Sequence, residues 1–406
     1  MFVVQRVLFA SLCLLFPMVV SAQSNTPSGP ADWQRTYAAD IGHPLDGLMR
    51  AVGTSGVHEA WLAPIFPSSH ASSLLALRNG DLLCFWFSGT WEGDSGVGIV
   101  MSRLRAGSSQ WTTPVLLDRH PGESYQNPVG FQAPDGTIWL LHTTQPAGKG
   151  EAQSRVLVLR STDNGESWSK PTVLMDTPGS FIRNPILTMP NGDWMLPMYY
   201  STAGSSVTVN DHPSIAISAD HGKTWKRCDI PEASEYVQPS VTFDPGHGYV
   251  ALLRSRRADH IYRSTSQDGC HWSAPVATVL PNNNAAIQTL RLEDGTILLA
   301  FNNTSAHVVN GKRQTGPRKP LSLALSTDDG LTWHGIRDIE TGRLGVTDAS
   351  KAPGREEYSY PALAHGRNGR IYLSYTFRRQ TIKIVSFPQS WLRRRTDVTK
   401  EVDTSF

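Results

Sequence analysis

The sequence predicts an all-β protein built as a six-bladed β-propeller, and three observations lead to this prediction. A short phrase of the form Ser-x-Asp-x-Gly-x-x-Trp recurs along the chain. Six glycine-turn hairpins recur out of phase with it, and no amphipathic helix of useful length interrupts either repeat. Six like units of roughly 60 residues favour a ring of small sheets, because radial closure protects the sheet edges.

The phrase predicts a structural turn. Its clean copies are "STDNGESW" (Ser161–Trp168), "SADHGKTW" (Ser218–Trp225) and "STDDGLTW" (Ser326–Trp333), and weaker copies are Thr265–Trp272 and Leu104–Trp111. Serine, threonine and aspartate bond nearby backbone N–H groups in turns, and the glycine allows a positive φ. No glutamate closes the loop as a calcium site requires, so we expect no calcium there. Repetition itself indicates a device of the fold.

The hairpins predict the strands. Each has a glycine turn between two apolar, β-rich runs, as in "LLALRNGDLLCFWFSG", a strong hairpin signal. The turn glycines are Gly80, Gly136, Gly192, Gly248, Gly295 and Gly369. The last unit has no Trp phrase, so we expect an N-terminal strand near Glu59–Phe66 to complete the ring.

The two ends of the chain lie outside this pattern. Residues 1–22 combine Arg6, an apolar run and a small-residue site at Ser21-Ala22, which is typical of a cleaved secretory signal peptide. We therefore expect a secreted or periplasmic protein with no membrane span after processing. The expected organisation is a signal peptide (1–22), a lead-in segment (23–45), the propeller (46–395) and a C-terminal tail (396–406).

Charge and cysteine content exclude several function classes. The net charge is +2 and only "WLRRR" is a basic cluster, so nothing favours nucleic acid or a membrane surface. After signal removal Cys84, Cys228 and Cys270 remain, with no disulfide framework and no zinc spacing. A bridge between Cys228 and Cys270 stays open. We expect no metal, no cofactor and a monomer.

Equivalent polar residues predict a binding site on one face of the ring. Counting about 8–11 residues back from each turn glycine gives a polar residue at a matching place. These residues are His70, Asn127, Asn184, Gln238, Asn284 and Tyr360. The second strands end in Ser88, Thr143, Tyr200, Arg254, Asn303 and Arg378. Such groups converging on one axis favour a polyhydroxylated ligand, a glycan.

The repeated phrase resembles the Asp-box (BNR) repeats of the sialidase superfamily, whose members are six-bladed propellers. This resemblance implies an arginine triad for the sugar carboxylate, a tyrosine–glutamate pair as nucleophile and an aspartate as acid/base. By position, Arg254 and Arg318 match two triad arginines, Tyr360 matches the tyrosine, and Asp94 in "SGTWEGDSGVG" matches the aspartate. Whether Tyr358 or Tyr360 faces the axis stays open.

Two departures from the sialidase pattern affect the expected chemistry. His70 replaces the arginine that begins the first blade, and Gln238 replaces the glutamate partner of the tyrosine. Glu235 is close by but three residues out of register. A tyrosine without its carboxylate is a poorer nucleophile, because nothing obvious in the sequence lowers its pKa of about 10.

Three functions remain compatible with the sequence. In an exo-glycosidase acting on a sialic-acid-like or uronic acid sugar, Asp94 or Glu92 is the proton donor and Tyr360 the nucleophile. Arg183 and Arg378 are then further candidates for binding the anionic group. In a polysaccharide lyase acting on a uronate glycan, His70 and Tyr360 are base and acid. A non-catalytic glycan-binding propeller needs neither Asp94 nor Tyr360.

Overall fold

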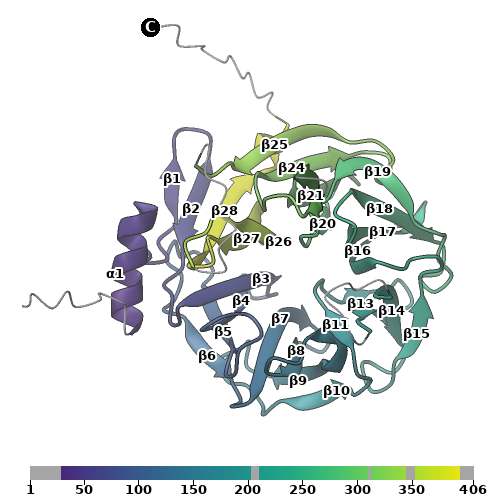
Figure 1. The fold of residues 1–406 in the computed structure, drawn as a ribbon, viewed down its shortest axis with the longest axis horizontal. Helices are drawn as coiled ribbons and strands as arrows, with labels where there is room; N and C mark the ends of the chain where they lie inside the picture. The colour runs from purple at the N-terminus through teal and green to yellow at the C-terminus, as the bar shows by residue number, and fades with distance from the viewer. Residues whose placement is uncertain (1–28, 203–209, 310–311, 344–352, 394–406) are drawn as a thin grey trace, which may run out of the picture.

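The computed structural model describes residues 29–202, 210–309, 312–343 and 353–393, and it confirms the six-bladed propeller. Six antiparallel sheets stand radially around a central axis, with the chain running once around the ring (Figure 1). Blades are numbered here in chain order from β3. The expected signal peptide (1–22) and tail (396–406) lie outside the described residues.

The first three blades follow one another without a break. Blade one contains β3 (Ser68–Ala76), β4 (Leu82–Gly89), β5 (Gly98–Leu104) and β6 (Val115–Asp118). Blade two contains β7 (Glu123–Gln132), β8 (Ile138–Pro146), β9 (Arg155–Ser161) and β10 (Thr172–Met175), with the short helix η1 (Glu151–Gln153) between β8 and β9. Blade three contains β11 (Ser180–Ile182), β12 (Leu187–Thr188), β13 (Trp194–Tyr200), β14 (His212–Ser218) and β15 (Lys226–Asp229).

The last three blades carry two additions. Blade four contains β16 (Tyr236–Asp244), β17 (Gly248–Ser255), β18 (His260–Ser266) and β19 (Val276–Pro281). Blade five contains β20 (Gln288–Arg291), β21 (Ile297–Asn302), β24 (Leu321–Ser326) and β25 (His334–Glu340), with a hairpin of β22 (His307–Val309) and β23 (Lys312–Gln314). Blade six contains β26 (Tyr358–His365), β27 (Arg370–Phe377) and β28 (Thr381–Pro388), followed by α2 (Gln389–Leu392).

A strand from the N-terminal side closes the ring. β2 (Val57–Trp61) pairs antiparallel with β28, placing Trp61 opposite Lys383, and β1 (Arg50–Val52) adds a fifth strand outside it. The first and last parts of the propeller therefore share one sheet, which ties the ring shut without an exposed seam.

The lead-in segment contains a helix that was not predicted from the sequence. α1 (Pro30–Ile41) starts with proline in its first turn and ends at Gly42, which has φ +80°. It lies at the periphery beside β1 and β2 (Figure 1). Tyr37 Oη donates to the Pro67 carbonyl at 2.8 Å. Within the described part of the chain no helix is long and apolar enough to cross a membrane.

Hydrogen bonds within the Ser-x-Asp-x-Gly-x-x-Trp phrase stabilise the turn between the third and fourth strands of a blade. Ser161 Oγ donates to Asp163 Oδ1 at 2.7 Å and accepts from the Gly165 N–H at 2.8 Å, while Asp163 Oδ1 also accepts from the Ser167 N–H at 3.0 Å. The same bonds recur around Asp220 and Asp328. These turns lie on the same face of the disc as the hairpin glycines.

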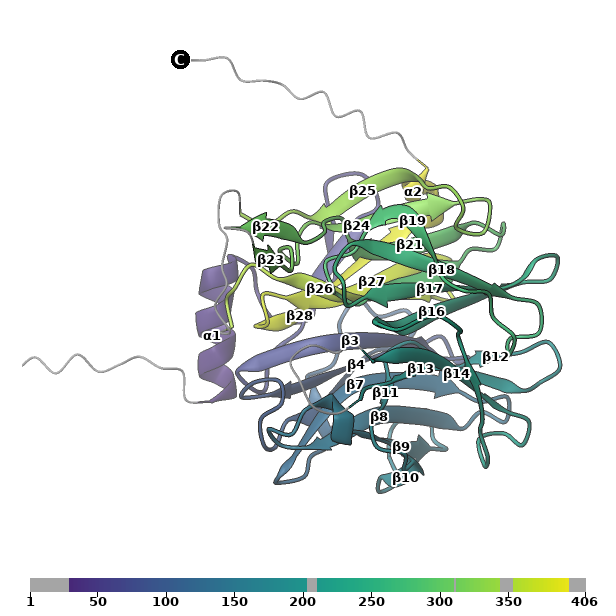
Figure 2. The same ribbon diagram turned by 45° about the vertical axis from the view of Figure 1, so that its right-hand side comes forward.

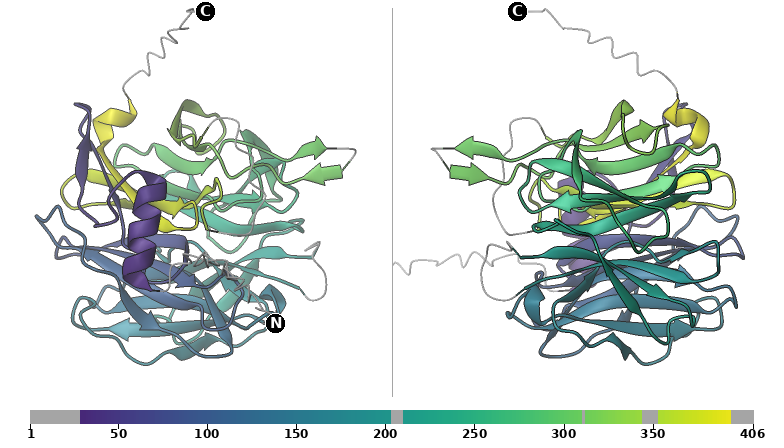
Figure 3. Two further views of the ribbon diagram at one scale, coloured as in Figure 1. Left: turned by 60° about the vertical axis from the view of Figure 1, so that its left-hand side comes forward. Right: turned by 90° about the vertical axis from the view of Figure 1, so that its right-hand side faces the viewer.

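The opposite face carries the loops between second and third strands and the entries to the inner strands (Figure 2). On this face the β22–β23 hairpin projects beyond the disc (Figure 3).

Blades three and four are also joined covalently: Cys228 on β15 and Cys270 form a disulfide, with Cα atoms 4.9 Å apart. Cys84 is a buried free thiol.

Candidate functional site

The inner strands are bent at one equivalent point. Positive φ angles occur at Ala71, Asn127, Gln238, Asn284 and Tyr360, and in β3, β7, β16 and β26 the pairing register shifts there. A β-bulge with a left-handed residue re-aims the side chains on either side of it, and it is uncommon for residues other than glycine. The repeated bulge brings side chains from several blades together at the axis.

Tyr360 lies where these blades meet. The guanidinium carbons of Arg183, Arg254 and Arg318 lie 5.4, 5.7 and 5.2 Å from its ring centroid, and the ring of His70 lies 4.3 Å away. These five residues, from blades one, three, four, five and six, are called the hub cluster below. Tyr358, two residues earlier, instead donates from its hydroxyl to Glu356 at 3.0 Å.

Arg254 is the direct partner of the Tyr360 hydroxyl. Its Nη1 donates to Tyr360 Oη at 2.7 Å and to Gln238 Oε1 at 3.0 Å, and its Nε donates to Asn284 Oδ1 at 2.9 Å. Gln238 and Asn284 therefore orient the arginine. Glu235 is turned to Arg257 instead, at 2.7 Å.

The electrostatic surroundings of Tyr360 differ from the sequence expectation. Burial raises the pKa of Tyr360, but the charges of Arg254 and Arg318 outweigh burial and leave this pKa below its ordinary value of 10.0. The sequence suggested that nothing lowers it, because the arginines come from separate blades. In this chain, guanidinium groups take the place that a carboxylate partner would have.

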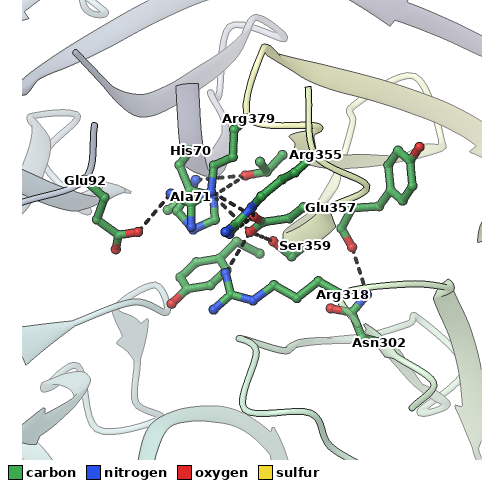
Figure 4. Close-up of polar contacts among 12 residues, drawn as sticks. His70, Ala71, Glu92, Asn302, Arg318, Arg355, Glu357, Ser359 and Arg379 are labelled. Atoms are coloured by element: carbon green, nitrogen blue, oxygen red, sulfur yellow. Dashed lines mark hydrogen bonds and ion pairs between the residues drawn. The ribbon is translucent and has the colours of Figure 1, made fainter. Parts of the chain in front are cut away.

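A second charged centre lies beside the hub cluster. Glu357 Oε1 accepts from Arg318 Nη1 at 2.7 Å, and Oε2 accepts from Arg379 Nε at 3.0 Å and pairs with Arg355 (Figure 4). Ser359 Oγ donates to the same carboxylate at 2.7 Å. The Glu357 side chain is 2% exposed.

The arginines set the ionisation of Glu357. Burial alone would raise its pKa, but Arg379 and Arg318 hold the pKa well below the ordinary range, so Glu357 is a carboxylate at neutral pH. Glu357 and Arg379 were not among the site residues predicted from the sequence. The available signal was "REEYSY", in which two acidic residues open an otherwise buried inner strand.

His70 lies beneath Tyr360 and does not face solvent. It is 0% exposed, its Nδ1 lies 2.7 Å from Thr376 Oγ1, and burial lowers its pKa well below the usual range. The residue at the bulge, equivalent to Tyr360, is Ala71. Counting back from the turn glycine was therefore one residue out in blade one, and a one-residue shift along a strand changes the face of a side chain.

The same shift explains two further differences. Arg378 turns outward, where Nη2 pairs with Asp40 of α1 at 3.1 Å, whereas Arg379 reaches Glu357. In blade five Asn302, rather than Asn303, is the buried residue that ends β21, and its Nδ2 donates to the Tyr358 carbonyl at 2.8 Å. We therefore place Arg378 outside the hub, whereas Asn303 is half-buried and its backbone N–H donates to the Pro320 carbonyl at 3.2 Å.

Two predicted amides connect neighbouring blades. Asn127 Nδ2 donates to the Ile182 carbonyl at 3.0 Å, and Asn184 Nδ2 donates to the carbonyls of Gln238 and Pro239 at 3.1 and 2.9 Å. Both asparagines are buried. Their donors hold the bulged inner strands against each other, so we assign them to positioning of the hub and not to ligand contact.

Carboxylates approach the hub cluster from two loops. After β4, Glu92 Oε2 pairs with Arg379 Nη1 at 2.8 Å with a side chain 31% exposed, while the exposed Asp94 accepts from Thr90 Oγ1 at 2.8 Å. After β8, Glu151 pairs with Arg256. Glu151, which the sequence analysis missed, also accepts from Tyr199 Oη at 3.0 Å.

One group of potential metal ligands lies on the turn face, away from the hub. It consists of Asp244, His247 and Asp329. Arg291 already pairs with both carboxylates, at 3.3 and 2.6 Å, and the ring nitrogen of His247 lies 2.6 Å from Asp329. A cation there would have to displace an arginine, so this group does not support a metal site.

Comparison with known proteins places the chain in a family. The model of the BNR repeat-like domain matches residues 80–373. A curated relative, the photosystem II assembly lipoprotein Ycf48 of Prochlorococcus marinus, is 26% identical over 177 residues, covering 44% of this chain and 42% of that protein. The chain thus matches less than half of the length of this relative.

Similar solved structures include two sialidases and one protein of unknown function. The Hadza microbial sialidase Hz136 aligns with a TM-score of 0.64 at 18% identity, over 80% of this chain and 66% of that one, just under two thirds of its length. The NanB sialidase of Streptococcus pneumoniae gives 0.63 at 13%, over 86% and 71%. A protein of unknown function from Dyadobacter fermentans gives 0.62 at 20%, over 82% and 98%.

At these identities the structural matches establish the fold. The family match spans more than half of the 406 residues and runs from the first hairpin turn into the last blade. The chain therefore belongs to the BNR repeat-like domain family, and its six-bladed propeller fold is similar to that of the two sialidases.

Proposed function

We propose that this protein is an exported, monomeric glycosidase that hydrolyses a terminal acidic sugar, sialic-acid-like or uronic, from a glycan. The observation that carries the proposal is a single tyrosine hydroxyl, that of Tyr360, held by Arg254 at 2.7 Å with Arg183 and Arg318 around the same ring. Guanidinium groups attract a sugar carboxylate, and a tyrosine of lowered pKa can attack or stabilise an oxocarbenium-like centre.

Arg318 and Arg254 differ in their exposure to solvent, and their proposed roles differ accordingly. Arg318 has a side chain 23% exposed and is the hub arginine open to a substrate carboxylate. Arg254 is buried, and its Nη1 and Nε are engaged by Tyr360, Gln238 and Asn284. Arg318 is thus proposed to bind the anionic group, and Arg254 to act on the tyrosine.

The proton donor is proposed to come from the loop after β4. Glu92 and Asp94 are both open to solvent there, and Glu92 is tied to the hub through Arg379. A donor must reach the leaving oxygen, and both loop positions border the site face. Replacing each acid separately decides between them.

A uronate lyase is the second candidate. Tyr360 with a lowered pKa could remove the proton next to a uronate carboxylate, with neutral Gln238 and charged Arg318 nearby. His70 is not proposed as the base, because it is 0% exposed and lies behind the tyrosine.

The test is product analysis on a panel of sialylated and uronate-containing glycans, using mass spectrometry. We expect a released acidic sugar from wild type and from Tyr358→Phe, and a loss of at least about a hundredfold in Tyr360→Phe, in line with removal of a nucleophile. Glu92→Gln and Asp94→Asn identify the donor. An unsaturated uronate would establish the lyase, and glycan binding without any product would establish a binding protein.

Export is tested separately. The signal peptide at residues 1–22 predicts that protein recovered from outside the cytoplasm begins at Gln23. N-terminal sequencing of secreted or periplasmic material measures this directly, and an intact Met1 on that material would contradict it.

A further inference from the structure

Arg183 carries a buried positive charge without a carboxylate. It is 1% exposed, and its Nη2 donates to the carbonyls of Tyr360 and Pro361 at 3.0 and 2.9 Å. Its Nε and Nη1 have no hydrogen-bond partner, and no carboxylate pairs with it, among the residues that the structure describes. An arginine stays protonated in proteins, and a buried charge without a counterion is costly.

Arg254 is likewise a buried cation that would be stabilised by a negatively charged partner. It is 4% exposed, and its hydrogen bonds go to Gln238, Asn284 and Tyr360, of which the first two are neutral amides. Within the described ranges no carboxylate lies within ion-pair distance of it. Two buried guanidinium groups therefore lie against one phenol, and Tyr360 is an ionisable side chain in direct contact with both.

We propose that Tyr360 is held as a phenolate in the resting protein by Arg183 and Arg254, so that it meets the substrate already charged and needs no glutamate partner. The phenolic proton is released to solvent before substrate binds. Arg254 Nη1 then donates to an oxyanion, a charge-assisted bond roughly twice as strong as a neutral one. Gln238 suits this arrangement, because a carboxylate in its place would compete with the phenolate for the arginine.

The other charged groups around Tyr360 do not abolish its preference for the phenolate form. Glu92 and Glu151 oppose ionisation, but each is engaged by an arginine of its own, Arg379 and Arg256. Arg318 favours the phenolate from blade five.

The remaining titratable neighbours do not reverse this preference of Tyr360 for the phenolate form. Glu357, on the same strand, is paired with Arg318 and Arg379. His70 has a pKa well below its usual range and is neutral at neutral pH. Tyr199 Oη donates a hydrogen bond to Glu151, and burial raises the pKa of Tyr199 well above 10.0.

Tyrosines elsewhere in the core show the contrast. Burial raises the pKa of Tyr358 and Tyr375, and nearby Glu356 and Glu340 raise it further. Tyr360 is equally buried, yet its pKa is lowered by Arg254 and Arg318. A titration should therefore separate Tyr360 from the other buried tyrosines.

The experiment is a near-ultraviolet tyrosinate titration of the full chain from about pH 6 to about pH 11, a range that brackets the ordinary tyrosine pKa of about 10. We expect one tyrosinate equivalent to be present already at about pH 7 in wild type and in Tyr358→Phe, about three pH units below that value. It should be missing from Tyr360→Phe and shifted upward by at least about one unit in Arg183→Gln.

Two results would overturn the proposal: native wild type contains no tyrosinate at about pH 7, or the tyrosinate seen at that pH persists in Tyr360→Phe. If a variant does not fold, carbon-13 NMR of tyrosine-labelled wild type still counts the ionised rings. This inference refines the part given to Tyr360 in the proposed function. Its test uses no substrate, so a failed titration and a failed activity assay are distinguishable.

Discussion

Replacing Glu357 by glutamine should destabilise the propeller more than most single substitutions. This carboxylate, 2% exposed, is bonded to Arg318 at 2.7 Å and Arg379 at 3.0 Å and is paired with Arg355. Glutamine keeps the volume but leaves three guanidinium groups around a neutral amide. Removing one partner of a buried ion pair costs about 3–5 kcal/mol, so we expect a loss in the free energy of unfolding of about that size.

The assay is urea denaturation of wild type and variant, followed by intrinsic fluorescence. Glu166→Gln is the matched control, because Glu166 is 54% exposed and pairs with Arg105 at 3.1 Å on the surface. Exposed pairs contribute about 0–1 kcal/mol, so this control should stay close to wild type. If Glu357→Gln also unfolds within about 1 kcal/mol of wild type, charge pairing at Glu357 does not hold the blades together as described.

Three further outcomes follow from the structure. Because the pKa of Glu357 is lowered on folding, its stabilisation should be complete above the unfolded value of about 4.3 and decline as pH falls toward the folded pKa; acid titration of stability should show a weaker dependence in Glu357→Gln. Replacing both Cys228 and Cys270 by alanine opens a span of 42 residues and should cost about 4 kcal/mol by loop-closure entropy, measured as a lower urea midpoint under non-reducing conditions, with an unchanged midpoint as the contrary result. Asp163→Ala removes the acceptor for Ser161 and Ser167 on the turn face, so thermal scanning should show a lower midpoint while glycan turnover stays at the wild-type rate; lost turnover in folded protein would contradict a purely structural turn.

The fold was readable from the sequence because its signals are local and repeated. The Ser-x-Asp-x-Gly-x-x-Trp turn is satisfied within eight residues, as the bonds around Asp163 show, and each hairpin is set by its own glycine turn. Closure by β2 also followed, since the last unit lacked a strand. The helix α1 precedes the repeats and has no periodic signal of that kind.

The site was only partly readable, because a bulge changes the count along a strand. Gln238, Asn284 and Tyr360 fell at the bulge as expected, whereas the count was one residue out for Ala71, Asn302 and Arg379. Side chains alternate faces along a strand, so an error of one residue assigns a side chain to the wrong face of the strand.

The charge balance could not be predicted at all from sequence spacing. Arg183, Arg254 and Arg318 come from three blades, and their effect on Tyr360 depends on distances that only the closed ring defines. Glu357 lies three residues before Tyr360, yet its partners Arg318 and Arg379 are 39 and 22 residues away in the chain.

The most direct test of the proposed function is to digest sialylated and uronate-containing glycans in water labelled with oxygen-18 and to measure the mass of the released sugar by mass spectrometry. Hydrolysis predicts one heavy oxygen atom in each released acidic sugar, with both release and label lost in Tyr360→Phe and kept in Tyr358→Phe. A released unsaturated sugar without the label, or full labelling in Tyr360→Phe, would contradict a glycosidase that acts through Tyr360.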